Sequence, residues 1–86
     1  MNLISRTDRE QFTISAIFKQ LSLAGIPLSC LTEDKDWRIN NTISKEKSDE
    51  WKQWFIAECR NTLKFTKKEA EEEFVFFEKK HGLTKI

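Results

Sequence analysis

Residues 63–83, LKFTKKEAEEEFVFFEKKHGL, contain the strongest helix-start signal in the chain. Thr66 can act as the N-cap of a helix, and Glu69, three residues later, can complete a capping box with it. Gly82 marks the end of the helix, because glycine is the residue that most often follows a last helical turn. The stretch therefore predicts a helix over residues 67–80.

Two further helices are predicted before this stretch. The first covers residues from about 8 to 24, and Gly25 followed by Pro27 ends it, because neither residue continues a helix well. The second covers residues from about 47 to 63 and begins with serine and acidic residues that suit the positive end of a helix. A short turn then leads directly into the last helix.

The segment between the first two helices, residues 26–44, has no helical period. Trp37 and Ile39 alternate with polar neighbours after a polar turn, which is typical of a short strand. The segment predicts either a short β-hairpin or an irregular excursion. The expected fold class is mainly α, a three-helix small domain that is single over residues 1–86 and becomes α+β if the hairpin is regular.

The helix predicted over residues 8–24 has apolar side chains on two opposite faces. One face is expected to be core, and it contains Ile14, Ile17, Phe18, Leu21 and Ala24. The other face contains Phe12, Ala16 and Leu23, which need cover from another part of the chain or from a second copy. The sequence therefore leaves open a homodimer that closes through Phe12 and Leu23.

The last two predicted helices supply further core residues, and the sequence also lacks the common catalytic motifs. Phe74 and Phe77 cluster on one face of the last helix and are expected to be a core pair. Cys59 falls on the apolar arc of the middle helix, where cysteine behaves as a small core residue, and its spacing to Cys30 favours two thiols over a bridge. No phosphate-binding loop, dinucleotide fingerprint or serine nucleophile motif occurs, so we expect no enzyme and no cofactor.

Charge and hydropathy exclude several function classes. Fifteen basic residues oppose fourteen acidic ones, and the two signs alternate along the chain, so no long-range field attracts nucleic acid or an anionic membrane. No apolar stretch approaches the length of a membrane span, and the first ten residues lack the apolar core of a signal peptide. We therefore expect a cytoplasmic protein, in a bacterial or host cytosol, without a membrane partner.

The apolar side chains exceed what a three-helix core requires. Trp54, Val75 and Phe76 are expected at the surface, where they form a patch. Glu71, Glu72 and Glu73, together with the lysines of the turn before the last helix, are expected at the rim of this patch. The first hypothesis is a non-enzymatic protein-interaction module that binds a larger host or viral protein through this aromatic patch. A compact, motif-free, Lys- and Glu-rich chain is also typical of a phage or mobile-element accessory protein.

The turn before the last helix favours an alternative hypothesis. It carries a basic cluster without an intervening acidic residue: Arg60, Lys64, Lys67 and Lys68. Such a cluster can contact phosphates, so the alternative is a small nucleic-acid-associated regulatory factor that uses the turn. Base reading by the last helix is not expected, because its first turns are rich in glutamates that phosphates would repel.

Overall fold

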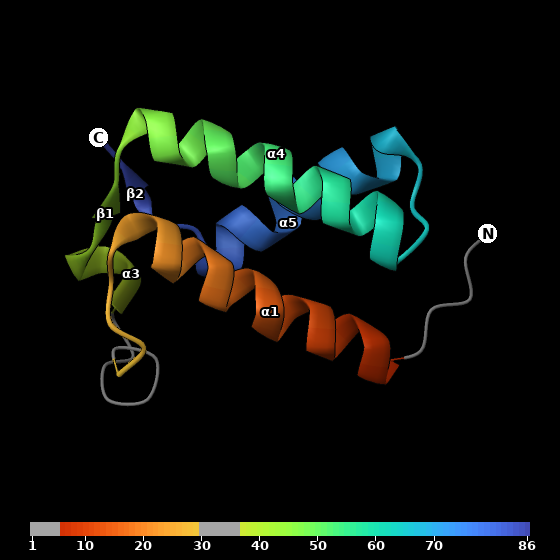
Figure 1. Ribbon diagram of the computed structural model, residues 1–86, viewed down its shortest axis with the longest axis horizontal. Helices are drawn as coiled ribbons and strands as arrows, with labels where there is room; N and C mark the ends of the chain where they lie inside the picture. The colour runs from red at the N-terminus through yellow and green to blue at the C-terminus, as the bar shows by residue number, and fades with distance from the viewer. Residues whose placement is uncertain (1–5, 30–36) are drawn as a thin grey trace.

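Three long helices make up most of the computed structural model, which describes residues 6–29 and 37–86. They are α1 (Arg6–Ala24), α4 (Lys45–Thr62) and α5 (Lys67–His81). Figure 1 shows α1 and α4 as two long neighbours, with α5 crossing behind them. The predicted class, a mainly α three-helix domain, is confirmed. Two of the helices begin two residues earlier than their predicted starts near residues 8 and 47.

The starts of α4 and α5 are fixed by local side-chain capping. The Ser44 hydroxyl accepts a hydrogen bond from the backbone N–H of Lys47 at 3.3 Å. At α5 the predicted capping box is confirmed: the Glu69 N–H donates to the Thr66 hydroxyl at 3.2 Å, and the Thr66 N–H donates to the Glu69 carboxylate at 2.8 Å. Each cap satisfies backbone donors that have no partner within the helix.

The core is a cluster of aromatic rings between α4 and α5. The Phe55 ring centroid lies 5.2 Å from that of Phe77 and 5.3 Å from that of Phe74. Trp51 is buried beside them, with its centroid 5.4 Å from both Phe55 and Phe77. The predicted core pair and the buried position of Cys59 are both confirmed.

The prediction of the core face of α1 is wrong for two residues at the centre of that face, Ile14 and Phe18. Ile14 and Phe18 remain 46% and 45% exposed, whereas Phe12 and Ala16 are buried. The reason is that Phe12 meets α4, where its ring packs edge-on against Phe55 at 5.3 Å. Phe12 is therefore not available to a second copy in this fold. Leu23, the other residue of the predicted dimer interface, is half-buried and packs against the core.

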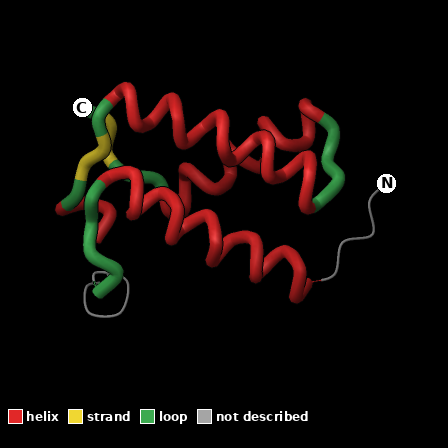
Figure 2. The backbone as a smooth tube through the Cα atoms, viewed as in Figure 1, coloured by secondary structure: helices red, strands yellow, loops and turns green. Residues whose placement is uncertain are grey.

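The described part of the segment before α4 takes the irregular alternative and forms no hairpin. Trp37–Asn40 form a single helical turn, α3. The strand β1 (Thr42–Ile43) follows and pairs in parallel with β2 (Thr84–Lys85) at the end of the chain. Figure 2 shows these short elements together at one end of the molecule. Residues 30–36, which include Cys30, lie outside the described residues.

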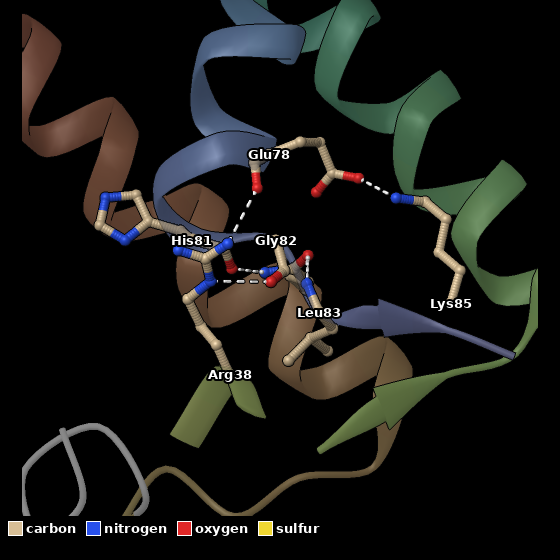
Figure 3. Close-up of polar contacts among 7 residues, drawn as sticks. Arg38, Glu78, His81, Gly82, Leu83 and Lys85 are labelled. Atoms are coloured by element: carbon tan, nitrogen blue, oxygen red, sulfur yellow. Dashed lines mark hydrogen bonds and ion pairs between the residues drawn. The ribbon is translucent and has the colours of Figure 1, made fainter. Parts of the chain in front are cut away.

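The end of α5 is held by the side chain of Arg38 (Figure 3). Its guanidinium donates to the carbonyl oxygens of Gly82 at 3.0 Å and Glu78 at 3.3 Å, and also to that of Lys80. The last carbonyls of a helix have no partner within the helix, so the arginine satisfies them and complements the negative helix end. The Lys85 ammonium also forms an ion pair with the Glu78 carboxylate.

A buried glutamine joins the same chain end to α1. Gln20 is almost completely buried, and its side-chain nitrogen donates to the carbonyl oxygen of His81 at 2.9 Å. The backbone N–H of Leu83 donates to the Gln20 side-chain oxygen at 3.4 Å. The last residues of the chain are thus fixed against both α1 and α3, which positions the end of α5 opposite α1.

Candidate interaction site between α1 and α5

A pocket opens between α1 and α5, and we call it the α1–α5 pocket. Its volume is about 110 Å³. Its apolar walls are Phe12, Phe55, Leu63, Phe76 and Phe77. Its polar lining residues are Arg9, Thr13, Glu73, Lys80 and His81. The pocket exists because α1 and α5 both pack mainly on α4, so their own facing sides do not close against each other.

An ion pair crosses one end of this pocket. The Arg9 guanidinium lies 2.5 Å from both carboxylate oxygens of Glu73, and this pair joins α1 to α5. The carboxylate is largely buried and the arginine is more than half exposed. Thr13 donates its hydroxyl to the backbone oxygen of Arg9 at 2.9 Å, as helical threonines commonly do. The polar groups at this end are therefore already satisfied within the protein.

The opposite end of the pocket carries positive charge. The Lys80 ammonium lies 4.8 Å from the centre of the Phe76 ring, within the range of a cation–π contact. The His81 ring packs on Phe77 with a centroid distance of 5.1 Å. Burial lowers the pKa of His81, and the neighbouring charges of Arg38 and Lys80 lower it further. This end therefore favours an anionic group.

The apolar surface continues from the pocket over α1. A second, shallower hollow is lined by Arg9, Glu10, Thr13 and Ile14, so it shares two residues with the pocket. Phe18 lies one helical turn after Ile14 on the same side of α1 and is similarly exposed. We call the pocket together with Ile14 the α1–α5 surface.

The three residues predicted to form the aromatic patch, Trp54, Val75 and Phe76, lie at different places on the surface. Phe76 is 51% exposed and lines the pocket. Val75 is equally exposed at 54% but is not among the pocket residues. Trp54 is partly buried against the core, because its ring stacks on Phe12 at 6.4 Å and on Trp51 at 5.7 Å. It lines a separate hollow between α1 and α4.

One of the three glutamates predicted at the rim lies at the pocket. Glu71 and Glu72 are exposed on α5 and do not line the pocket. Glu73 lines the pocket, as the partner of Arg9. The sequence also did not identify Arg9, Thr13 and Ile14 as site residues. For Ile14, the one sequence signal was the presence of two apolar stripes on α1, and the structure buries some residues of both stripes while it leaves Ile14 exposed.

The predicted basic cluster is exposed at the turn between α4 and α5. Its members are Arg60, Lys64, Lys67 and Lys68. Lys64 adopts a left-handed backbone conformation with φ 60°, which reverses the chain after α4. The Glu69 N–H in the first turn of α5 is already bonded within the capping box. This reduces the number of backbone donors that the helix start offers to a phosphate.

The Cys59 thiol is free and buried in the core. Burial raises the pKa of the Cys59 thiol to about 12, and the nearby Glu73 carboxylate raises it as well. The thiol is therefore protonated at neutral pH and is a poor nucleophile. Within residues 6–29 and 37–86, no group of three or more His, Cys, Asp or Glu side chains is placed to hold a metal ion.

Comparison with known proteins adds no assignment: no protein-family model, curated protein or solved structure matches this chain. The helices in the described residues are also too short or too polar to cross a membrane. What the structure establishes is a small, mainly α domain with an apolar pocket between two of its helices.

Proposed function

We propose that the protein is a non-enzymatic interaction module that docks a partner protein on the α1–α5 surface. The observation that supports this proposal is the position of Phe76, which is half exposed at the rim of an apolar pocket. Exposed aromatic side chains beside a pocket are typical of the centres of protein interfaces, where a few residues supply most of the binding energy.

A standard protein interface would occupy only a small part of this chain. A standard interface buries about 800 Å² on each partner, which is roughly an eighth of the 6083 Å² of accessible surface on this chain. Ile14 and Phe76 would form the apolar centre of such a contact. Arg9, Glu10 and Lys80 would form its polar rim, where charges set orientation and the rate of encounter.

A phage or mobile-element accessory protein that acts on a larger host or viral protein in the cytoplasm remains the biological setting that we favour. Small size and the lack of a recognisable catalytic motif support it. In this setting binding itself is the activity, and the partner supplies any chemistry.

The test compares two neighbouring residues of α5 with nearly equal exposure. The partner is first captured from a bacterial lysate with the full chain, in the presence of nuclease and at high salt, and is identified by mass spectrometry. The affinity of Phe76→Ala for that partner is then compared with the affinity of Val75→Ala. We expect Phe76→Ala to bind about tenfold or more weakly and Val75→Ala to bind like the parent.

Both alanine variants should keep their melting temperature, because each replaced side chain is about half exposed and alanine is the better helix former. This separates a loss of binding from a loss of folding. Equal affinities for the two variants would remove the α1–α5 surface from the proposal. A large drop in melting temperature for Phe76→Ala would instead assign its side chain to the core.

A second candidate function rests on the exposed basic turn, where the side chains of Lys67 and Lys68 can contact phosphates. A nucleic-acid-associated factor that used this turn would bind with little sequence preference and would lose affinity steeply as salt rises. Lys67→Glu combined with Lys68→Glu tests it: unchanged retention on DNA would exclude these two residues. Nucleic acid in the capture experiment that is lost with nuclease and salt would favour it.

A further inference from the structure

We propose that the α1–α5 pocket receives one aromatic side chain from the partner, and that an adjacent carboxylate of the same partner segment pairs with Lys80. This inference rests on the proposed function and specifies the chemistry of the segment that is recognised. It commits to an acidic segment of a protein as the occupant.

The shape and lining of the pocket suit a single ring. Closed cavities of about 150 Å³ with aliphatic and aromatic linings hold benzene. The α1–α5 pocket, at about 110 Å³, is somewhat smaller but is open to solvent on one side, so a ring can enter while its attachment stays outside. Rings of Phe12, Phe55 and Phe77 offer edges and faces to the incoming ring.

The charges around the pocket specify what accompanies the ring. Arg9 and Glu73 neutralise each other across one end. At the other end, Lys80 has no ion pair with any of the residues that the structure describes, and its ammonium already lies over Phe76. Arg38 adds positive charge close to His81. An occupant with a carboxylate near its ring is attracted by this end, whereas a basic occupant is repelled.

Small probes test the pocket without knowledge of the partner. Amide chemical shifts of the isotope-labelled full chain are recorded during titration with phenylacetate, benzyl alcohol and benzylamine, which share a ring and differ in charge. We expect phenylacetate to shift the amides of Thr13, Phe76 and His81 with a Kd of about 1 mM, as small ligands of this size allow. Benzyl alcohol should bind about two- to fivefold more weakly, and benzylamine more weakly still.

Three variants distinguish the contribution of the probe's aromatic ring to binding from the contribution of its charge. Lys80→Gln should make phenylacetate and benzyl alcohol bind equally. Thr13→Leu places a larger side chain into the pocket and should abolish the binding of all three probes. Thr7→Leu is its matched control, because it makes the same replacement at an exposed position of α1 that does not line the pocket, and it should leave binding intact. Equal binding of benzylamine and phenylacetate, or no shift at the pocket amides, would overturn the inference.

The captured partner links the probe result to the proposed function. Phenylacetate should compete with the partner, and a partner that depends on Phe76 but is not displaced by the probe would refute this inference while leaving the proposed function standing. Probe binding without any captured protein would refute the proposed function. A free aromatic acid that co-purifies with the chain would show that the occupant is a small molecule and would overturn our choice of a protein segment.

Discussion

Replacement of Gln20 by leucine tests how the end of the chain is held on α1. Leucine has a similar size, but it cannot bond the carbonyl oxygen of His81 or the N–H of Leu83. Both backbone groups would then be left without these partners in the interior. A buried polar group without a partner costs about 1–3 kcal/mol.

The loss of unfolding free energy in Gln20→Leu can be estimated from the lengths of the two hydrogen bonds. The 2.9 Å bond to His81 is near ideal and its loss should cost about 2 kcal/mol, whereas the 3.4 Å bond from Leu83 is long and its loss should cost about 1 kcal/mol. Leucine avoids the free-energy cost of burying an amide group, which stabilises the folded state by about 1 kcal/mol. The expected net loss for Gln20→Leu is about 2 kcal/mol, or roughly 8–16 °C in melting temperature for a domain of this size.

Urea unfolding and thermal melts measure this loss, and Gln11→Leu is the matched control. Gln11 lies on the same helix and is exposed, so its replacement should change stability by less than about 0.5 kcal/mol. The Leu83 amide should also exchange its hydrogen faster in Gln20→Leu, at conditions where the rest of the chain stays protected. If Gln20→Leu is as stable as the control, the two backbone groups do not depend on this side chain.

Three further predictions concern single residues. Gly82→Ala should cost about 2 kcal/mol or more in urea unfolding, because an added Cβ would lie 2.6 Å from a backbone oxygen, whereas Gly25→Ala, with φ 74° and open space around it, should cost only about 1 kcal/mol. Burial lowers the pKa of His81 in the folded state, so the unfolded chain takes up the proton more readily. The parent should therefore lose stability as pH falls through 6.5, and the difference between the parent and His81→Gln should shrink or reverse at acidic pH. In a Cys30→Ser background, Cys59 with its pKa of about 12 should react with thiol reagents at pH 8 only when the chain unfolds, so its labelling rate should rise with urea in parallel with unfolding.

Local signals in the sequence were sufficient to predict the three long helices, but they predicted neither the helical turn α3 nor the long-range pairing of the strands. The capping box of Thr66 and Glu69 lies within four residues, so its geometry is almost fully specified by the sequence. The parallel pair of β1 and β2 joins two-residue segments that are separated by two helices, and no periodicity can be read from segments so short. The sequence left a hairpin and an irregular excursion open before α4, and residues 37–44 take the irregular form.

The choice between two apolar faces of α1 depends on the partner helix. A helical wheel shows that Ile14 and Phe12 lie on opposite sides, but it cannot show which side meets α4. The aromatic contact between Phe12 and Phe55 decides the orientation and leaves Ile14 outside. Gln20 was missed for a related reason, because its burial depends on backbone groups at the far end of the chain.

The candidate site was therefore predictable in part. Phe76 was recognised because it points away from the core pair on its own helix, which is a local property. Its neighbours in the pocket, Arg9 and Thr13, come from α1, and only the packing of both helices on α4 brings them together. A single sequence does not contain that information in a form that spacing or composition reveals.

The pocket itself is a cost to the isolated chain, and this supports its role in binding. An open space beside aromatic rings loses the dispersion contacts that a filled core would make, and the Arg9–Glu73 pair that crosses it is partly exposed and contributes at most about 1 kcal/mol. A fold selected for stability alone would fill this space with a larger side chain at position 13. Thr13→Leu should accordingly raise the melting temperature above that of Thr13→Ala while it abolishes partner binding, as expected where function opposes stability. If Thr13→Leu instead gains stability and keeps full affinity for the captured partner, the pocket is a packing defect and the partner docks elsewhere.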